Sequence, residues 1–310
     1  MIIDGKQISL EVLKELKEYI RLKNLKLRLA AVLVSNNLGI RKFVELKGKA
    51  AKEAGIDYDI FEFPETITEP ELKQEVRKLV EDDKNNGVLV ELPLPEGINA
   101  QNVLNEITLN KDVDVLSRQA QDKFYEVERG QTPNGGLTSS RPQVLPPAVE
   151  ALNIVLDFYK FSIKNKPRSR NSESFRDSVA EPQSEFSLQG KKAVVFGQGI
   201  LVGKPISHWL EQQGVETFRI DENTKNPEKY SLRADIIVSG VGKPELIDGD
   251  MVKNGTVAID FGYENKEGKM VGDFNFDEVS PKAGLITPVP GGIGPVVVAA
   301  VLKNLVKINS

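Results

Sequence analysis

The chain has 310 residues, of which 40% are hydrophobic and 28% charged, a composition typical of a folded protein with room for two domains. Its formal net charge of −4 argues against binding to nucleic acid or to an anionic membrane surface. The absence of cysteine and the single histidine exclude disulfides, cysteine nucleophiles and histidine-rich metal sites, so we expect no metal.

The first third of the chain alternates between helical and strand patterns. Thr68 and Glu71 form a capping box that predicts the start of a helix. In chain order, the patterns predict a helix over residues 8–24, a strand over 29–34, a helix over 39–54, a strand over 58–63, a helix over 68–82 and a strand over 87–92. This alternation predicts a parallel sheet with helices on its faces.

After an irregular middle part, the same alternation returns. The patterns predict a helix over residues 146–160, a strand over 193–196, a helix over 203–213, strands over 216–220, 234–239 and 256–260, and a final helix over 295–308. We therefore expect an α/β fold of two lobes, each a parallel sheet with flanking helices.

Residues 164–187 differ from both lobes in composition. Lysine, arginine, serine, asparagine and glutamate dominate there, with two isolated phenylalanines. Such a segment buries too little apolar area to offset the entropy of ordering it. The composition predicts a disordered surface insertion, with the binding of a partner as the alternative.

A glycine-rich turn follows the predicted strand at 193–196. Gly197 and Gly199 would let the backbone approach a pyrophosphate, and the helix that starts near Gly203 offers unpaired N–H groups to it. The spacing is GxGxxxG rather than GxGxxG, and a purely structural turn is the alternative. Together with the flanking strands and helix, the turn predicts that the second lobe is a Rossmann-like dinucleotide-binding domain.

Two charged residues near the end of the next strand point to different cofactors. Asp221 would bind the adenosine ribose and repel a 2′-phosphate, which favours NAD. Arg219, helped by Lys225, could instead pair with that phosphate, which favours NADP. The two residues lie on one strand face and could also pair with each other, or Asp221 could merely end the strand. The sequence leaves this choice open.

Four short motifs carry more specific information. They are Leu-Pro-Leu-Pro at 92–95, Lys-Asp-Val-Asp at 111–114, Gly-Lys-Pro at 203–205 and Ile-Thr-Pro-Val-Pro-Gly-Gly-Ile-Gly-Pro at 286–295. In this order they resemble the methylenetetrahydrofolate dehydrogenase/cyclohydrolase family along nearly the whole chain outside 164–187. The resemblance implies a folate-binding catalytic domain over 1–145, completed by the helix at 295–310, and an NAD(P)-binding domain over 146–294.

The family's Tyr-x-x-x-Lys motif corresponds to Phe43 and Lys47 in this sequence. The four-residue spacing puts both side chains on one helix face. The resemblance implies that Phe43 stacks on the folate, without a hydroxyl, and that Lys47 binds the substrate and transfers a proton. The alternative is a core phenylalanine beside a solvated lysine.

Glu91 takes the place of a family glutamine before the Leu-Pro motif. A carboxylate beside Lys47 would stabilise its ammonium form. It could also stabilise the cationic methenyl product or act as the base for the attacking water. We expect Glu91 to change the balance between the two family activities, with hydrolysis the more sensitive.

Asp114 matches the family aspartate that holds the pterin, whose ring N–H and amino group its two oxygens can accept together. Asp112 is expected to be structural. Val115-Leu116-Ser117 replaces the family's Gly-Phe-His, and residues 143–147 replace Pro-Cys-Thr-Pro, which puts the shape of the site in doubt. The resemblance adds Pro288, Gly291 and Gly292 to the substrate site. It assigns Gly197, Gln198, Gly199, Val202, Gly203, Lys204, Pro205, Arg219, Asp221, Gly242 and Ile293 to the cofactor site.

The implied function is oxidation of 5,10-methylenetetrahydrofolate with hydride transfer to NADP or NAD, followed by hydrolysis to 10-formyltetrahydrofolate. The replaced residues leave two alternatives, an NAD-dependent dehydrogenase with impaired hydrolysis and a non-catalytic folate- or dinucleotide-binding relative. Family members are commonly homodimers through the second lobe. Because no apolar run approaches the roughly 20 residues of a membrane span, we expect a cytoplasmic protein. The resemblance implies that its small-molecule partners are tetrahydrofolate derivatives.

Overall fold

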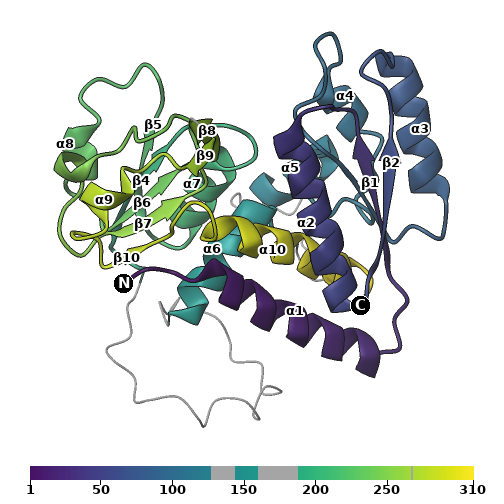
Figure 1. Ribbon diagram of the computed structural model, residues 1–310, viewed down its shortest axis with the longest axis horizontal. Coiled ribbons are helices and arrows are strands. Elements are labelled where there is room, and N and C mark those ends of the chain that lie inside the picture. Colours follow the sequence, from purple (N-terminus) through teal and green to yellow (C-terminus); the bar gives the residue numbers. More distant parts are fainter. Residues whose placement is uncertain (127–143, 160–187, 267) are drawn as a thin grey trace. The chain divides into compact units, whose positions relative to one another are not determined.

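The computed structural model of the protein describes residues 1–126, 144–159, 188–266 and 268–310 (Figure 1). The chain forms two compact units. The three-stranded unit consists of Gly5–Ala151 and Gly294–Ser310, and the five-stranded unit of Met1–Asp4 and Leu152–Ile293. The insertion predicted at 164–187 lies outside the described residues.

A parallel sheet with the strand order β2-β1-β3 forms the centre of the three-stranded unit. Its strands are β1 (Arg28–Leu33), β2 (Asp57–Glu62) and β3 (Gly87–Val90). The central strand pairs in parallel with both neighbours, so a crossover must join successive strands. The helices are α1 (Gly5–Leu22), α2 (Leu38–Ala54), α3 (Glu69–Glu81), α4 (Ala100–Leu104), α5 (Arg118–Glu126), the start of α6 (Pro147–Phe158) and nearly all of α10 (Ile293–Ile308).

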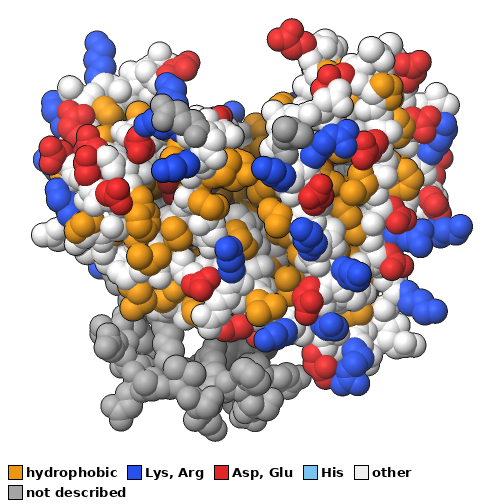
Figure 2. Space-filling model, in the orientation of Figure 1, with side chains coloured by type: hydrophobic (Ala, Val, Ile, Leu, Met, Phe, Trp, Pro, Cys, Tyr) orange, Lys and Arg blue, Asp and Glu red, His pale blue; other side chains and the backbone are white. Residues whose placement is uncertain are grey.

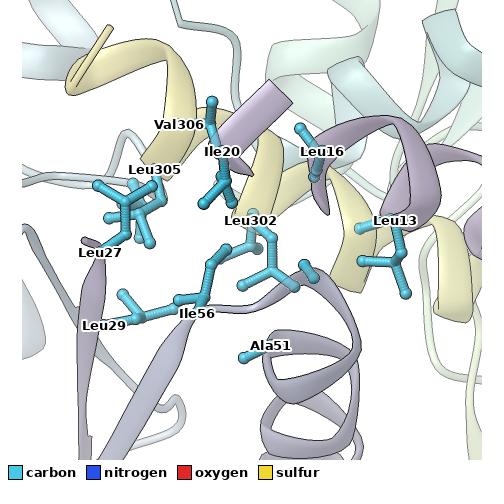
Figure 3. Close-up of a cluster of buried hydrophobic side chains, with 14 of the residues drawn as sticks. Leu13, Leu16, Ile20, Leu27, Leu29, Ala51, Ile56, Leu302, Leu305 and Val306 are labelled. Atoms are coloured by element: carbon cyan, nitrogen blue, oxygen red, sulfur yellow. The ribbon is translucent and has the colours of Figure 1, made fainter. Parts of the chain in front are cut away.

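The alternation of side chains along β1 explains why helices cover both faces of this sheet. Leu29 and Ala31 belong to an apolar cluster with residues of α1, α2 and α10, whose side chains point toward one another in Figure 3. Ala30 and Val32 belong to a second cluster with residues of α3 and α4. A strand buried on both faces needs apolar residues throughout, which is the pattern of residues 29–34.

Local capping signals determine where two of these helices begin and end. The side chain of Asn37 accepts hydrogen bonds from the N–H groups of Gly39 and Ile40 at the start of α2, and Gly55 ends the helix with a φ of 76°. The capping box of Thr68 and Glu71 is present at the start of α3, as the sequence predicts.

The five-stranded unit contains a parallel sheet with the order β10-β7-β6-β4-β5. The strands are β4 (Lys192–Phe196), β5 (Glu216–Ile220), β6 (Ile236–Ser239), β7 (Val257–Asp260) and β10 (Leu285–Ile286). A small hairpin joins β8 (Glu264–Lys266) and β9 (Lys269–Val271), and the shorter helical elements are α7 (Gly203–Gln212), α8 (Glu228–Ser231), η1 (Gly249–Met251) and α9 (Phe276–Val279).

The strand order of the five-stranded unit indicates where a ligand can bind. The first strand, β4, lies between β5 and β6, so the chain passes to one side of β4 and then to the other. In open parallel sheets of this kind, ligands bind at the carboxyl ends of the strands where the winding direction reverses. The loops after β4 and β6 therefore lie at the expected dinucleotide position.

The predicted fold class, with two parallel sheets flanked by helices, is confirmed. The boundary between the units falls within α6, after Ala151, rather than at 145/146, because one helix continues from one unit into the other. Met1–Asp4 belong to the five-stranded unit, where the N–H of Ile3 donates to the carbonyl of Ile286 at 2.8 Å.

The distribution of charged side chains on the surface agrees with the low net charge, and the described helices agree with the absence of a long apolar run. On the face shown in Figure 2, acidic and basic side chains are interspersed over both units. Within the described ranges, no helix combines the length and the hydrophobicity that crossing a membrane requires.

Candidate functional site

Helix α2 and the carboxyl end of β3 bring Lys47 and Glu91 together. Glu91 directly follows β3, and its backbone N–H donates to the carbonyl of Val32 at 2.9 Å, which fixes its place at the sheet end. The ammonium of Lys47 donates to both carboxylate oxygens of Glu91, at 2.8 and 2.9 Å. The two side chains are only 9% and 7% exposed. They form a buried, bidentate ion pair.

This pairing gives Lys47 a defined charge and direction. Taking two charges out of water is costly, and each charge compensates the other only while the contact is intact. The Lys47 nitrogen also lies 5.7 Å from the ring centroid of Phe43, one turn earlier on α2. Lys47 is therefore not the solvated helix lysine of the alternative interpretation.

Asp114 lies in the loop between α4 and α5, within electrostatic range of this pair. Burial raises the pKa of Asp114 to about 7, the Lys47 ammonium opposes the rise, and the carboxylates of Glu91 and Asp112 add to it. No residue in the described part of the chain donates a hydrogen bond to its carboxylate. Asp114 thus titrates near neutrality and keeps acceptor capacity for a ligand.

The loop that carries Asp114 is fixed from two sides. Asn304 of α10 donates a hydrogen bond from Nδ2 to the carbonyl of Val113 at 2.9 Å. Asp112 is buried and accepts a hydrogen bond from the backbone N–H of Ser117 at 2.8 Å. Asp112 therefore has the structural place that the sequence predicts, whereas Asn304 is a supporting residue that the sequence analysis missed.

Val115, the residue after Asp114, has an unusual backbone conformation. Its φ is 58°, in the left-handed region that a β-branched residue strongly disfavours. The family has a glycine at this position, which would adopt this conformation without steric cost. Val115 therefore holds this backbone conformation at an energetic cost.

The glycines of the turn after β4 are needed for different reasons. A Cβ on Gly203 would overlap the carbonyl oxygen of Gly197, so the start of α7 lies directly against the turn. Gly197 itself has a φ of 81°. A Cβ on Gly199 would meet nothing within 4 Å. The turn thus leaves open space in front of a helix N-terminus, which fits a pyrophosphate group.

The first turn of α7 can accept an anion. Val202, at the cap position, makes no side-chain hydrogen bond to the helix, and the N–H of Lys204 donates to the carbonyl of Gly199 at 3.1 Å. The side chain of Gln198 donates a hydrogen bond from Nε2 to the carbonyl of Gly197 at 2.9 Å. At the start of the helix, Pro205 is buried and Lys204 is exposed. The positive end of the helix dipole remains available to a phosphate.

Arg219 and Asp221 do not pair with each other, so that alternative is wrong. The guanidinium of Arg219 donates to Oε2 of Glu211 on α7 at 2.7 Å. The Asp221 carboxylate accepts from the backbone N–H of Asn223 at 3.0 Å and from Oγ1 of Thr224 at 2.9 Å. Glu211 is within reach of the Arg219 guanidinium because α7 packs beside β5. The Asp221 carboxylate instead stabilises a turn at the end of β5.

Two buried acids hold the loop after β6, and the sequence analysis missed their role. The carboxylate of Asp273 accepts from the N–H groups of Val241 at 2.7 Å and Lys243 at 2.8 Å, and it thereby fixes Gly242, whose φ is 73°. Asp260 accepts from the N–H of Asp273 at 3.1 Å, and burial raises the pKa of Asp260 to about 7. The only sequence signal was an acid at the end of a predicted strand.

The proline- and glycine-rich run leads from β10 into α10 in the five-stranded unit. Gly291 has a φ of 97°, and a Cβ on Gly292 would overlap the carbonyl oxygen of Pro288. Ile293, which begins α10, is buried. These residues fix a tight backbone path, while Phe43 and the Lys47 pair lie in the three-stranded unit. The predicted substrate residues are thus divided between the units.

Among the described residues, no group of three or more histidines, aspartates or glutamates is arranged to hold a metal ion.

Comparisons with known proteins match both units. The model of the tetrahydrofolate dehydrogenase/cyclohydrolase catalytic domain matches residues 3–114, and that of the NAD(P)-binding domain matches residues 180–310.

Individual relatives span almost the whole chain. The bifunctional protein FolD of Thermodesulfovibrio yellowstonii is 34% identical over 311 residues, covering 98% of this chain and 95% of the relative. The FolD structure from Campylobacter jejuni is 32% identical with a TM-score of 0.82, covering 99% and 98% of the two chains. The Trypanosoma brucei dehydrogenase-cyclohydrolase, solved with NADP and an inhibitor, is 27% identical with a TM-score of 0.83 over 99% and 96%.

Proposed function

The chain belongs to the tetrahydrofolate dehydrogenase/cyclohydrolase family, and on that premise we propose that the buried pair of Lys47 and Glu91, with Asp114 beside it, carries its chemistry. That chemistry is oxidation of 5,10-methylenetetrahydrofolate to the methenyl form with hydride transfer to NAD(P), followed by hydrolysis to 10-formyltetrahydrofolate. The protein is an enzyme of one-carbon metabolism. The bidentate Lys47–Glu91 contact is the observation that carries the proposal.

The ion pair allows a lysine to lie beside a developing cation. Loss of a hydride leaves a positive charge on the one-carbon bridge of the folate, and a lone ammonium nearby would oppose it. Because Glu91 binds the Lys47 ammonium with both oxygens, the pair has no net charge. An ionised Asp114 adds a negative charge that favours the cation further.

The same contact makes the hydrolysis step harder. The attacking water must lose a proton, and a base serves best when an oxygen is free to accept it. The Lys47 ammonium donates to both Glu91 oxygens and so favours the charged carboxylate, and a proton taken up by Glu91 from water would weaken this ion pair. We therefore expect oxidation to be favoured over hydrolysis in this chain.

Asp114 and Phe43 would orient the folate. The Asp114 carboxylate has acceptor capacity for the ring N–H and amino group of the pterin, and the Phe43 ring offers an apolar face for stacking. The resemblance to the family also assigns Pro288, Gly291 and Gly292 of the five-stranded unit to substrate binding. We assign substrate recognition to these residues and proton transfer to Lys47.

The turn of Gly197, Gly199 and Gly203, the first turn of α7 and the loop at Gly242 would hold the dinucleotide, whose nicotinamide accepts the hydride. We propose NAD as the preferred cofactor. Arg219 is engaged by Glu211 at 2.7 Å, and Asp221 adds a second negative charge near the end of β5. A 2′-phosphate would have to displace the first contact and would be repelled by both acids.

Absorbance assays of both steps on the purified protein test the proposed chemistry. Methenyltetrahydrofolate should appear together with reduced cofactor, and it should then decay faster than in buffer alone. Lys47→Met should lower the hydrolysis rate at least about 100-fold, since it removes the proton-transfer group, and should lower the hydride-transfer rate less, because that step moves no proton. Lys49→Met, at an exposed lysine of the same helix, should leave both rates unchanged. Equal rates in the Lys47→Met variant and the parent would contradict the proposal.

The Glu91→Gln variant tests the balance between the steps. An amide keeps the size of the side chain but cannot form the ion pair, so the ratio of hydrolysis to oxidation should rise about tenfold. A ratio equal to that of the parent would show that Glu91 does not set the balance.

The cofactor proposal is tested by measuring kcat/KM for NAD and NADP in parallel. NAD should be favoured about tenfold or more, and Asp221→Ser should narrow that difference. Asp250→Ser, at an exposed acid elsewhere in the five-stranded unit, should leave the preference for NAD unchanged. A preference for NADP in the parent protein would overturn the assignment.

A homodimer through the five-stranded unit and a cytoplasmic location remain predictions. The homodimer is supported by the position of β5 at the edge of its sheet. A hollow beside this strand, whose lining includes Phe218, Tyr230 and Leu232, supports it as well. Light scattering after size-exclusion chromatography would test the dimer, and cell fractionation would test the location.

A further inference from the structure

Tyr58 of β2 occupies space that α2 leaves open next to Lys47. A Cβ on Gly48, the residue after Lys47, would lie 3.2 Å from Cδ1 of Tyr58, so a larger residue there would press on the ring. Glycine is unfavourable inside a helix, and this ring accounts for its presence. Tyr58 also packs against the apolar cluster that contains Val113, one residue before Asp114.

The hydroxyl of Tyr58 is buried, and no atom of the described residues forms a hydrogen bond with it. Burial raises the pKa of Tyr58 well above its ordinary value, and the charges of Glu91 and Asp114 raise it further. The hydroxyl therefore keeps its proton and acts as a donor. A buried donor without an acceptor is unfavourable, so its retention suggests that an acceptor becomes available in another state of the site.

Asp114 is the acceptor that the arrangement leaves open. Each oxygen of Glu91 already accepts a hydrogen bond from Lys47, whereas no described residue donates to Asp114. A carboxylate has about four lone-pair positions, so a tyrosine hydroxyl and two N–H groups of a pterin can be accepted together. The two groups thus offer a donor and an acceptor that complete each other.

We propose that Tyr58 is a positioning residue for substrate binding, and that its hydroxyl donates a hydrogen bond to Asp114 when that carboxyl ionises on folate binding. This bond stabilises the ionised form and fixes the direction of the carboxylate toward the pterin. The inference rests on the proposed role of Asp114 in binding the substrate.

The charged surroundings of Asp114 determine what loss of this hydroxyl should do. The groups concerned are Lys47 from α2, Glu91 after β3, Asp112 in the same loop and Tyr58 from β2. The carboxylate of Asp112 is already held by backbone N–H groups. Without the hydroxyl, the Asp114 carboxylate keeps only the attraction of Lys47 against two nearby acids and should ionise at a higher pH.

The Tyr58→Phe variant tests the inference, because it removes the hydroxyl and keeps the ring against Gly48. At pH 7 the KM for 5,10-methylenetetrahydrofolate should rise about 5- to 10-fold, with kcat changed less than about twofold. The acid limb of the kcat/KM profile should move up by about half a pH unit or more, and the difference between variant and parent should become smaller at high pH. The melting temperature should stay equal or rise, since an unpaired buried hydroxyl is lost.

Controls separate this role from packing and from the role of Asp114. Tyr19→Phe, at an exposed tyrosine of α1, should change neither KM nor the pH profile. Gly48→Ala adds a methyl group against the ring but keeps the hydroxyl, and it should not move the acid limb. A Tyr58→Phe variant with the parent's KM and pH profile overturns the inference. If Asp114→Asn raises KM while Tyr58→Phe does not, only the role of Tyr58 fails. If Asp114→Asn also leaves KM unchanged, the proposed substrate contact fails with it.

Discussion

Asp114, the proposed pterin ligand, lowers the stability of the folded chain at neutral pH. Its carboxyl keeps a proton up to a pH of about 7 in the folded chain, whereas an aspartate of the unfolded chain loses it near pH 4. Between these values the native state binds more protons than the unfolded state, so the unfolding free energy falls as the pH rises. The contribution of Asp114 is fully present below about pH 4 and lost by about pH 7.

The Asp114→Asn variant should therefore gain stability relative to the parent as the pH rises. We expect the unfolding free energy of Asp114→Asn, relative to that of the parent, to be about 3–4 kcal/mol higher at pH 8 than at pH 4, because the amide carries no charge to bury. Urea unfolding at both pH values measures this. Asp83→Asn, at an exposed position, is the control and should show no such trend. A pH-independent difference for Asp114→Asn would contradict the prediction.

Val115 gives a second prediction at the residue scale. At an ordinary position, glycine is less stable than alanine by about 0.5–1 kcal/mol. At Val115 the positive φ reverses the order, since alanine keeps the strain and glycine relieves it. Val115→Gly should thus be more stable than Val115→Ala by about 1 kcal/mol. Denaturant unfolding of the two variants measures the difference. A glycine variant less stable than the alanine variant would show that the loop is not strained.

At the scale of elements, the turn between β4 and α7 separates stability from binding. A Cβ at Gly203 would overlap the Gly197 carbonyl, whereas one at Gly199 would enter open space. One glycine is thus required for packing, and the other is available for a ligand.

The two alanine substitutions in this turn should behave differently. Gly203→Ala should destabilise the protein by about 3 kcal/mol or more, because backbone atoms must move to admit the new carbon. Gly199→Ala should leave the melting temperature within about 1 °C of the parent and weaken cofactor binding at least about tenfold. Thermal unfolding and titration with NAD measure both effects. Equal destabilisation by the two substitutions would contradict this division of roles.

At the scale of the whole molecule, the first residues of the chain belong to the unit formed mostly by its second half. The N–H of Ile286 donates to the carbonyl of Met1 at 3.0 Å, and that of Ile3 donates back to Ile286 at 2.8 Å. The side chain of Ile3 is fully buried, whereas Ile2 is 57% exposed. The five-stranded unit is therefore complete only with residues from the start of the chain.

Ile3→Ala should consequently destabilise the protein by about 2–4 kcal/mol, since it leaves a cavity where a fully buried side chain stood. Ile2→Ala, one residue away and exposed, should change the unfolding free energy by less than about 0.5 kcal/mol. Denaturant unfolding of both variants provides the comparison. Similar small effects for both would mean that the N-terminal segment does not contribute to the core of that unit.

Local patterns were sufficient to predict much of this protein. The apolar run at residues 29–34, the capping box at Thr68 and the glycines after β4 each act within a few residues. The sequence alone therefore determined the two parallel sheets and the position of the glycine-rich turn. The motif around Pro288–Pro295 was specific enough to indicate the family. What these signals share is that their physical cause is short in range.

Only the tertiary structure decided the pairings between distant residues. Lys47 binds Glu91, 44 positions away, and Arg219 binds Glu211 instead of Asp221. The unpaired hydroxyl of Tyr58 lies within electrostatic range of Glu91 and Asp114. These contacts depend on strand order, on register and on which helix lies over which strand. Such features arise from packing among segments far apart in the chain, and no local pattern encodes them.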